Sequence, residues 1–527
     1  MKLGTLCCAA EIDLPCGAEN RNVTSVETDS RRVSPGSLFI CIRGLHTDSH
    51  CCIADAVARG ASVILTEKGA SFQRPKGDVI LLEAENTRRA SAILYHAWYG
   101  FPGKALKLIG VTGTNGKTSI THMLRHILES AFLPCGLIGT LGCESRGRPL
   151  ESVPVDALAN MTTPDPQVLY RLLAQMVKDG VEYVLMEVSS HALALEKLAP
   201  LQFELSIFTN LTQDHLDFHK TMEAYADAKA SLFAKSRCSI LSVDSPYADR
   251  MRRQATGRVV SCSSESRSAD YRAFPLSKDG REGVQYRLEA EHLSLRLFCP
   301  IPGQFSMTNS MQAAVAAMEL GIRPTRVKEA IASLPGIKGR MERIPLGVDA
   351  DFTVLIDYAH TPDALENLLL TARKICGKGE RIVLLFGCGG NRDAGKRPIM
   401  GQIACSYADF VILTSDNSRD EDPNDILAQI LSGMDPAHEH IVILDRKKAI
   451  EHAILYAEKG DLILLAGKGH EEYEIVRGER RCFSERKIVE SALLARRRRN
   501  DRRQDASSPE DRERHTASER KESDLKE

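Results

Sequence analysis

The chain has 527 residues, 43% of them hydrophobic and 26% charged, and its formal net charge is −1. This composition is typical of a soluble globular protein. The near-neutral balance excludes a global attraction to nucleic acid or to acidic membrane surfaces, so function must come from local sites. At about 150 residues per domain, the length predicts three or so domains.

The cysteines and the apolar runs indicate the compartment. Fifteen cysteines are scattered without any CxxC pair, which favours reduced thiols over disulfides or a zinc ribbon. The opening apolar patch is too short for a secretory signal, and no run reaches the length of a transmembrane helix. We therefore expect a cytoplasmic monomer with no membrane insertion and no bound nucleic acid.

Residues 1–103 predict a small α/β domain. The runs "GSLFICIRG" and "GASVILTE" are typical of short strands, and "HCCIADAVARG" between them is typical of a helix. Proline and glycine in "WYGFPGKALK" then interrupt the pattern. We place the first domain boundary at this stretch, near Gly103.

A phosphate-binding loop opens the second domain, residues 104–336. "LKLIGV" predicts a strand, "GVTGTNGKTS" begins at Gly110, and apolar residues recur at helical spacing after it. In this context the glycines let backbone N–H groups approach phosphate oxygens, Lys117 supplies a charge, and Thr118 can reach a magnesium ion. The predicted nucleotide contacts are Gly113, Thr114, Asn115, Gly116, Lys117 and Thr118.

Two further strand-like runs end in polar residues. "VEYVLMEVSSH" places Glu187 where an acidic magnesium ligand would lie at the tip of a neighbouring strand. "LSIFTNLTQDHLDFH" ends with His215 and His219. We favour His215 as a ligand to a second magnesium ion, although imidazole is unusual for so hard a cation. The alternatives are an ordinary polar turn or a His-x-x-x-His zinc pair, which would need a third ligand.

The remaining pattern predicts a mixed second domain and a Rossmann-like third domain. Alternation from about 255 to 300, clearest in "VQYRLEAEHLSLRLF", predicts antiparallel strands. Within residues 337–495, buried-strand runs separated by helical patterns predict a parallel sheet. Residues 496–527 have almost no apolar side chains. We expect them to form a disordered tail rather than the alternative, a basic nucleic-acid arm.

Several motifs together carry a resemblance to a known family. They include "GVTGTNGKTS", "EVSSHAL", "TNLTQDHLDFH", "AYADAKASLF", "DYAHTPDAL", "SDNSRDEDP" and "AGKGHEEY". The set resembles the Mur ligases of peptidoglycan synthesis over roughly residues 20–490, and most closely their MurE branch. The long spacing of the phosphate loop is the form these ligases share with folylpolyglutamate synthetases. The resemblance implies an α/β fold of three domains: a UDP-binding N-terminal domain, a central ATPase domain with added antiparallel strands, and a Rossmann-like domain that binds the amino acid.

The resemblance also implies the reaction and its metals. ATP phosphorylates the terminal carboxylate of UDP-N-acetylmuramoyl-L-alanyl-D-glutamate, and the amino group of an incoming amino acid attacks the acyl phosphate. Thr118 and Glu187 are expected to hold one magnesium ion, and Glu187, His215 and Lys229 to act at a second. In the family the lysine at the position of Lys229 is carbamylated, whereas the residues alone favour a solvated helix lysine near Asp227. The expected catalytic residues are Lys117, Lys229 and His215.

Other substrate contacts follow from the resemblance alone. Asn309 is expected at adenine, Arg340 at a phosphate and Asp357 at the ribose. The dipeptide channel is expected to include Thr162, Thr163, Ser189 and Lys197. The residues expected on the uridine-diphosphate side are Ser30 and His46.

The incoming amino acid in the MurE branch is either meso-diaminopimelate or L-lysine, which differ by a carboxylate at the far end. A guanidinium binds a carboxylate in bidentate geometry, while acidic and carbonyl groups accept from the neighbouring ammonium. A site of this kind rejects an analogue that lacks the polar group by about 10⁴ to 10⁵, so we predict meso-diaminopimelate. The residues expected to bind it are Arg392, Asp416, Asn417, Arg419, Gly467 and Glu471.

The chain departs from the family pattern at three places. Ser418 stands where the diaminopimelate motif usually has proline, which removes a fixed φ from the loop. Lys197 replaces an arginine at the dipeptide site, which keeps the charge but not the fork, and Ser306 replaces an asparagine before the adenine site. The open alternatives are an L-lysine-adding MurE, a folylpolyglutamate-synthetase-like ligase and a nucleotide-dependent regulatory protein.

Overall fold

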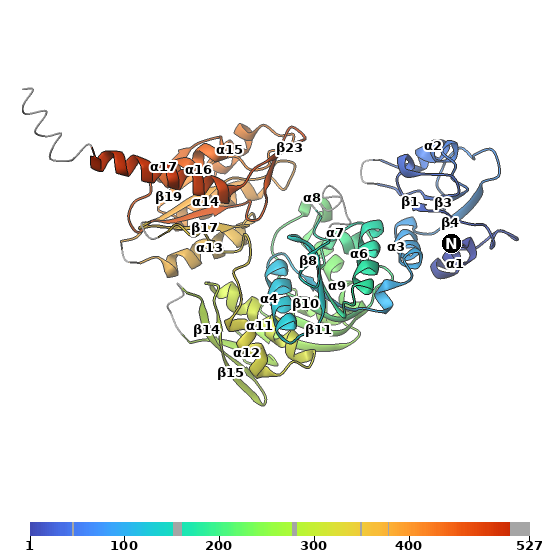
Figure 1. Cartoon of the computed structure of the whole chain (residues 1–527), viewed down its shortest axis with the longest axis horizontal. Helices are drawn as coiled ribbons and strands as arrows, with labels where there is room; N and C mark the ends of the chain where they lie inside the picture. Colours follow the sequence, from blue (N-terminus) through green and yellow to red (C-terminus); the bar gives the residue numbers. More distant parts are fainter. Residues whose placement is uncertain (45–46, 151–160, 277–281, 348–349, 378, 506–527) are drawn as a thin grey trace, which may run out of the picture.

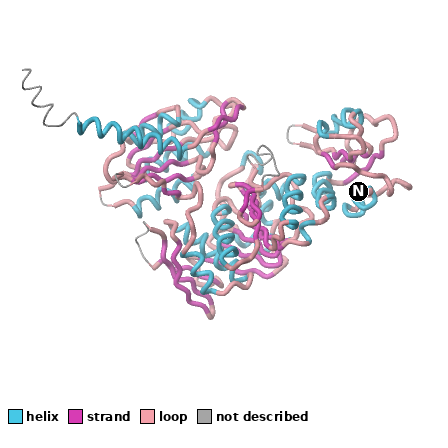
Figure 2. Tube along the Cα trace, viewed as in Figure 1, coloured by secondary structure: helices cyan, strands magenta, loops and turns pink. Residues whose placement is uncertain are grey.

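Three sheet-based units follow one another along the chain. The computed structural model describes residues 1–44, 47–150, 161–276, 282–347, 350–377 and 379–505. The N-terminal and C-terminal units flank a central unit (Figure 1). In each unit helices accompany the strands (Figure 2).

The N-terminal unit is a four-stranded parallel sheet in the order β1-β2-β3-β4. Its elements are α1 (Leu3–Ala10), β1 (Val26–Glu27), β2 (Leu38–Ile40), α2 (Ile53–Ala58), β3 (Val63–Glu67), β4 (Ile80–Ala84) and α3 (Thr87–Trp98). The predicted strands and the helix between them are confirmed as β2, α2 and β3. Tyr95 in α3 donates through its hydroxyl to the carbonyl of Val26 at 3.0 Å, which ties the helix to the sheet edge.

The central unit is built on an eleven-stranded sheet in the order β15-β14-β13-β12-β11-β10-β5-β9-β6-β7-β8. Its strands are β5 (Lys107–Thr112), β6 (Cys135–Gly139), β7 (Gly142–Ser145), β8 (Arg148–Pro149), β9 (Tyr183–Glu187), β10 (Phe203–Phe208), β11 (Ser236–Ser242), β12 (Arg258–Ser263), β13 (Tyr271–Pro275), β14 (Val284–Ala290) and β15 (Leu293–Cys299). Its helices are α4 (Lys117–Ser130), α6 (Pro166–Lys178), α7 (Ser190–Ala194), α8 (Leu216–His219), α9 (Met222–Ala230), α10 (Ala248–Gln254), α11 (Gln304–Glu319) and α12 (Pro324–Ala332).

Three parallel strands of this sheet end side by side. β5 pairs in parallel with β9 on one side and with β10 on the other. The loops that follow these strands therefore leave the sheet at the same edge, where α/β folds bind their ligands. The apolar face of α4 covers the sheet, as its helical spacing predicts, through Ile120, Met123, Leu124, Ile127 and Leu128.

The antiparallel strands predicted from about 255 to 300 are confirmed only in part. β13, β14 and β15 pair antiparallel, but β12 still runs parallel to β11, and β13 runs parallel to β12. The alternation that signals a half-exposed strand does not report the direction of its neighbour. These strands extend the central sheet rather than forming one of their own.

The C-terminal unit contains the predicted parallel sheet. The order is β16-β17-β21-β18-β19-β20, with β16 antiparallel at the edge. The strands of this sheet are β16 (Glu342–Arg343), β17 (Thr353–Asp357), β18 (Ile382–Phe386), β19 (Phe410–Leu413), β20 (His440–Val442) and β21 (Leu462–Ala466). A separate antiparallel pair follows, β22 (Tyr473–Val476) and β23 (Glu479–Cys482). Its helices are α13 (Pro362–Ile375), α14 (Lys396–Tyr407), α15 (Pro423–Leu431), α16 (Arg446–Leu455) and α17 (Glu485–Asp505).

The disordered tail expected from residue 496 is wrong for its first ten residues, because α17 continues to Asp505. Arg496 donates to the carbonyls of Ile454 and Ala457 at 2.7 and 2.8 Å, and Arg499 donates to the carbonyl of Leu455 at 2.7 Å. These cations satisfy carbonyls at the C-terminal end of α16, where the helix dipole favours positive charge. Residues 506–527 lie outside the described part of the chain.

No disulfide joins any of the fifteen cysteines, all of which lie in the described part of the chain. Over the part of the chain that the structure describes, no helix combines the length and the apolar character needed to cross a bilayer.

A buried ion pair anchors α17 to α16. Arg446 donates through Nε to Glu485 Oε1 at 2.8 Å and through Nη2 to the carbonyl of Ala466 at 2.8 Å. Both side chains are at most 2% exposed, and burial raises the pKa of Glu485. Removing one partner of such a pair leaves an uncompensated buried charge.

We expect Arg446→Met to lower the free energy of unfolding by about 3–5 kcal/mol, because Glu485 would keep its charge without a partner. Urea titration followed by circular dichroism measures this change. Lys447→Met, at a neighbouring side chain that is 62% exposed, serves as the control and should change the free energy by less than about 0.5 kcal/mol. Equal unfolding midpoints for the two variants would contradict the expected role of the pair.

Candidate active site

A cavity of about 320 Å³ is lined by both the central and the C-terminal units. It lies at the carboxyl ends of β5, β9 and β10 and of the parallel strands of the C-terminal sheet, where the sequence predicts ligands. The predicted site residues that line it are Thr114, Asn115, Gly116, Lys117, Thr118, Thr162, Glu187, His215, Asn309, Arg340, Asp357, Arg392, Asp416, Asn417, Arg419, Gly467 and Glu471.

The phosphate loop requires glycine at two positions. Gly113 has φ of 150°, and a Cβ there would lie 1.8 Å from Thr209 Oγ1. Gly116 has φ of 87°, and a Cβ there would lie 2.6 Å from Asn309 Oδ1. Lys117 Nζ donates to two carbonyl oxygens of the loop, both at 2.9 Å. The loop is therefore a tight backbone cradle with a lysine at its centre, the form that suits a polyphosphate.

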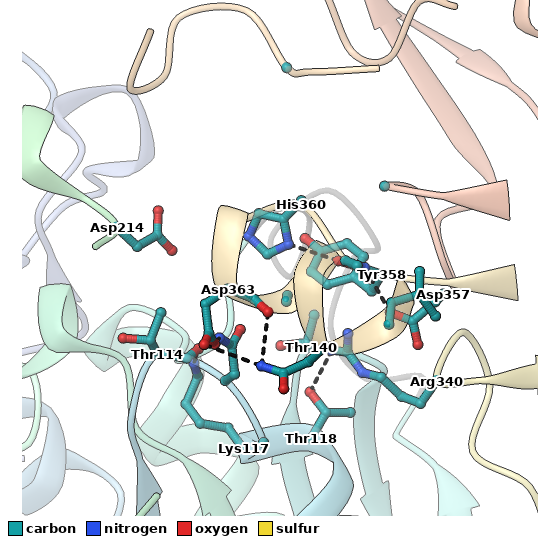
Figure 3. Close-up of a pocket in the computed structure, with 18 of the residues that line it drawn as sticks. Thr114, Lys117, Thr118, Thr140, Asp214, Arg340, Asp357, Tyr358, His360 and Asp363 are labelled. Carbon is teal, nitrogen blue, oxygen red and sulfur yellow. Dashed lines mark hydrogen bonds between the residues drawn. The ribbon is translucent and has the colours of Figure 1, made fainter. Parts of the chain in front are cut away.

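Glu187 lies at the end of β9 with its carboxylate fully enclosed. Thr118 Oγ1 donates to Oε2 at 3.0 Å, and the Thr140 hydroxyl and backbone N–H donate to the two oxygens at 2.9 and 3.0 Å. Arg340 Nη2 donates to Thr118 Oγ1 at 3.1 Å (Figure 3). A hydroxyl and a carboxylate beside the loop are the hard oxygen ligands that Mg²⁺ prefers.

Among the described residues there is no group of three or more His, Cys, Asp or Glu that could hold a metal ion. Mg²⁺ commonly keeps several waters and is bound through one or two protein oxygens plus substrate phosphates. The pair formed by Thr118 and Glu187 fits that mode of binding rather than an all-protein cage.

Lys229 is buried, and the alternative of a solvated helix lysine is wrong. Its side chain donates to the carbonyl of Gly113 at 2.9 Å and lies 4.6 Å from the centre of the Tyr225 ring. Asp227 pairs instead with Arg250, at 2.5 Å. Burial, with a smaller repulsion from a second lysine, holds the pKa of Lys229 well below its ordinary value, which favours the neutral, nucleophilic form of the amine.

His215 immediately precedes α8 and has φ of 55°. Burial lowers its pKa to about 3, so the ring is neutral and can act as a ligand. His219 does not line the cavity, and its Nε2 lies 2.8 Å from Ser190 Oγ. The zinc-pair alternative lacks the third ligand it needs, since the described ranges contain no group of three or more His, Cys, Asp or Glu that could hold a metal ion.

Burial also lowers the pKa of several other histidines. The residues are His96 and His360, with pKa values of about 4, and His122 and His470, with values of about 3. These rings stay neutral in the folded protein at pH values where the unfolded chain, at an ordinary 6.5, binds protons.

We therefore expect the free energy of unfolding to fall as the pH drops from 6.5 to about 4. Each such histidine contributes up to about 1.4 kcal/mol per pH unit, because between its two pKa values the unfolded state binds more protons than the folded state. Urea titrations at half-unit pH intervals measure the slope. A stability that is constant or increasing toward pH 4 would contradict the expectation.

A compact polar group forms the C-terminal side of the cavity. Asn417 Nδ2 donates to Glu471 Oε2 at 2.7 Å. Arg419 Nη1 donates to the carbonyl of Gly390 at 2.7 Å, which anchors one end of the guanidinium. Gly467 has φ of 112°, and a Cβ there would lie 2.7 Å from Asp416 Oδ2.

The loop around Ser418 is held by backbone contacts. The N–H of Gly390 donates to the carbonyl of Asn417 at 2.9 Å, and the N–H of Arg419 donates to the carbonyl of Ile475 at 3.1 Å. A Cβ on Gly390 would lie 1.9 Å from the Ser418 carbonyl oxygen, so the two loops pack backbone to backbone. These contacts hold the arginine without the fixed φ of a proline.

The predicted dipeptide residues lie together beside the cavity. Thr163 Oγ1 donates to the carbonyl of Glu187 at 2.8 Å and lies 3.2 Å from Ser189 Oγ. Lys197 Nζ pairs with Asp165 at 2.7 Å. Of the dipeptide set, Thr162 lines the cavity itself.

Of the two residues expected to bind the uridine diphosphate, the structure describes only one. Ser30 begins a 3₁₀ turn, Ser30–Arg32, in the N-terminal unit and does not line the cavity. His46 lies outside the described residues.

Sequence reasoning missed three residues that organise the site. Thr140 supports Glu187. Asp363 Oδ2 accepts from Asn115 Nδ2 at 2.7 Å, which joins α13 to the phosphate loop (Figure 3). Lys468 contacts Asn417 Oδ1 at 3.1 Å. Asp363 and Lys468 lie within the quoted "DYAHTPDAL" and "AGKGHEEY", but nothing in those letters shows which partners they meet.

Three family models match the chain in series. They are the Mur ligase family catalytic domain over residues 22–99, the Mur ligase middle domain over residues 111–317, and the Mur ligase glutamate ligase domain over residues 339–469. A curated UDP-N-acetylmuramoyl-L-alanyl-D-glutamate–2,6-diaminopimelate ligase from Syntrophomonas wolfei is 40% identical over 500 residues, covering 94% of this chain and 99% of the relative. The chain belongs to the Mur ligase family.

Further relatives and solved structures of this Mur ligase indicate the same family and fold. A protein of the same name from Clostridium perfringens is 38% identical over 482 residues, covering 90% of this chain and 96% of the relative. A solved structure of a UDP-N-acetylmuramoyl-L-alanyl-D-glutamate–2,6-diaminopimelate ligase is 31% identical, with a TM-score of 0.65, and covers 94% of this chain and 100% of that one. A MurF structure from Acinetobacter baumannii, at 16% identity and a TM-score of 0.61 over 94% of this chain and 98% of that one, shows a shared fold alone. The predicted family and three-domain fold are confirmed.

Proposed function

We propose that this Mur ligase joins meso-diaminopimelate to UDP-N-acetylmuramoyl-L-alanyl-D-glutamate in the cytoplasm, with cleavage of ATP to ADP and phosphate. One observation carries the proposal: a single cavity has the phosphate loop and Glu187 on one side and Arg419, Asn417 and Glu471 on the other. The curated relatives from Syntrophomonas wolfei and Clostridium perfringens are named for these substrates. The N-terminal Mur ligase model over residues 22–99 speaks against the folylpolyglutamate alternative.

The phosphate loop would bind ATP through its backbone N–H groups and Lys117. Asn309 would contact adenine, since it lies directly over Gly116 at the end of the loop. Arg340 would contact a phosphate, because its guanidinium already reaches the Thr118 hydroxyl. Two backbone N–H groups donate to the carboxylate oxygens of Asp357 at 2.7 and 2.8 Å. The remaining lone pairs of these oxygens would accept hydrogen bonds from the ribose hydroxyls.

Two magnesium ions would act at this site. Thr118 and Glu187 would hold the first, and Glu187, His215 and a carbamate on Lys229 would hold the second. When bound, the ions would neutralise phosphate charge and orient the reacting groups.

The carbamate on Lys229 would add a third ligand to Glu187 and His215, since among the described residues no group of three or more His, Cys, Asp or Glu could hold a metal ion. A neutral amine adds to carbon dioxide, forming an N–C bond and releasing a proton. The lowered pKa of Lys229 favours that neutral amine. The side chain touches the Gly113 carbonyl at 2.9 Å, so the new carboxylate would lie beside the phosphate loop.

The reaction brings two anions together. The dipeptide carboxylate would attack the γ-phosphorus and ADP would leave; the incoming amine would then attack the acyl carbon, lose a proton and expel phosphate. Lys117 and Arg340 would offset the repulsion between carboxylate and phosphate. Thr162, Thr163, Ser189 and Lys197 would position the dipeptide. Ser30 and His46 would bind the uridine diphosphate.

The far end of the incoming amino acid would be recognised through its charged groups. Arg419 and Arg392 would bind the far carboxylate of meso-diaminopimelate. Asp416, Asn417 and Glu471 would accept from the neighbouring ammonium. L-Lysine has no such carboxylate and would leave the guanidinium groups unpaired.

Isotope transfer tests this proposal. The dipeptide substrate is labelled with ¹⁸O in its terminal carboxylate and incubated with ATP, magnesium and meso-diaminopimelate. An acyl phosphate transfers one ¹⁸O atom to the released phosphate, which mass spectrometry detects. Phosphate release without the label would overturn this route, and absence of ADP would overturn the ligase assignment.

A further inference from the structure

Lys468 is a buried cation directly behind the amino-acid side of the cavity. It follows β21 between Gly467 and Gly469, which have φ of 112° and 56°. Its side chain is 0% exposed, so it cannot touch a substrate in the cavity. Its Nζ lies 5.6 Å from the centre of the Phe483 ring. Any effect of Lys468 on a ligand must therefore pass through its neighbours.

Those neighbours are the residues that face the cavity. Lys468 Nζ donates to Asn417 Oδ1 at 3.1 Å. It lies 3.5 Å from Glu471 Oε2 and 3.8 Å from Asp416 Oδ1. One cation thus contacts all three groups that the proposed function assigns to the substrate ammonium.

The orientation of the Asn417 amide follows from these contacts. Its Oδ1 also accepts from the backbone N–H of Ile475 at 2.9 Å. Both Lys468 and a backbone N–H can only donate, so the oxygen must face them and the NH₂ group must face Glu471 Oε2, at 2.7 Å. Lys468 thereby fixes which Glu471 oxygen is already occupied and which is left for a ligand.

Lys468 also sets the charge behind the cavity. The side chains of Asp416 and Glu471 are only 9% and 13% exposed, and two neighbouring carboxylates repel unless a cation lies between them. The three cations Lys468, Arg392 and Arg419 and the two carboxylates Asp416 and Glu471, when all are ionised, together carry a formal charge of about +1. The far end of meso-diaminopimelate is net neutral, whereas the side chain of L-lysine adds a positive charge and is disfavoured there.

We propose that Lys468 is a positioning residue that determines amino-acid specificity, by holding the Asn417 amide and the Asp416 and Glu471 carboxylates in the arrangement that accepts an ammonium beside a carboxylate. This inference rests on the proposed function. Without the cation, the amide can rotate and the carboxylates can separate, so the discrimination between the two amino acids decreases.

Lys468→Met removes the charge and the donor at similar length. With this variant we expect the KM for meso-diaminopimelate to rise by at least about tenfold, the cost of one unsatisfied buried polar contact. The KM for ATP should stay within about twofold, and the preference for meso-diaminopimelate over L-lysine should fall by about tenfold. An unchanged KM and preference, or an equal loss with both amino acids, would overturn the inference.

Lys468→Gln keeps a donor for Asn417 without the charge and serves if the methionine variant does not fold. Its KM for meso-diaminopimelate should lie between those of the wild type and the methionine variant; a wild-type value would overturn the role of the cation. Lys338→Met is the matched control, because this lysine is 51% exposed and pairs with Glu472 outside the cavity. Wild-type protein that forms no product would overturn the proposed function and this inference with it, whereas active wild type with unaffected variants would overturn this inference alone.

Discussion

Replacing Lys229 with alanine is expected to lower the rate of ligation by at least about a thousandfold while leaving the affinity for ATP within about threefold. The side chain is 1% exposed and lies against the Gly113 carbonyl. Alanine removes the proposed carbamate and one ligand of the second magnesium ion, but it leaves the loop and Lys117 in place. Product formation by mass spectrometry and equilibrium nucleotide binding measure the two effects.

Lys235→Ala is the control for losing a partly buried lysine. Lys235 donates to the carbonyls of Leu198 and Ala199 at 3.1 and 2.7 Å, away from the cavity. Its substitution should leave turnover within about threefold of wild type. Wild-type activity should also fall in buffer freed of carbon dioxide and return with bicarbonate. Persistent turnover by Lys229→Ala would show that the carbamate has no role.

The second large effect is expected at Arg419. Arg419→Lys should lower kcat/KM for meso-diaminopimelate by about 10² to 10³, because an ammonium cannot replace the fork that binds a carboxylate. In the structure one guanidinium nitrogen is already bonded to the Gly390 carbonyl at 2.7 Å, so a shorter point charge cannot keep both contacts. The KM for ATP should not change, since the loop lies on the other side of the cavity.

Arg481→Lys provides the matched control for this substitution. Arg481 is 56% exposed and pairs with Glu479 at 3.0 Å in the same unit. Its replacement should leave kcat/KM unchanged for both amino acids. Equal losses in the two variants, or no loss in Arg419→Lys, would mean that another group binds the far carboxylate.

Much of the fold follows from local sequence pattern. The strands around the cavity are continuous apolar runs, as expected for parallel strands buried on both faces, and α4 shows a single apolar stripe. The end of α17 was not predictable in this way, because its last turns carry almost no apolar residues. They are held by Arg496 and Arg499 on carbonyls about 40 residues earlier in the chain, a tertiary contact with no local signal.

The candidate site likewise contains residues that the sequence pattern predicts and residues that it does not. Glu187 was predictable because it ends a buried strand beside the phosphate loop. Lys229 was assigned through the family resemblance, since only burial distinguishes it from a solvated lysine. The contact between Asn115 and Asp363 joins residues 248 positions apart, and Lys468 depends on neighbours from three segments. Such roles arise from tertiary packing between distant segments rather than from spacing along the chain.

The most direct measurement is the mass of the product formed when the enzyme receives ATP, magnesium, UDP-N-acetylmuramoyl-L-alanyl-D-glutamate and an equimolar mixture of meso-diaminopimelate and L-lysine. The arrangement of Arg419, Asn417 and Glu471 around one cavity predicts almost exclusively the diaminopimelate tripeptide, with one ADP formed per product. Predominance of the lysine tripeptide would contradict the assigned specificity, and the absence of both products would contradict the assignment of this cavity as a ligase site.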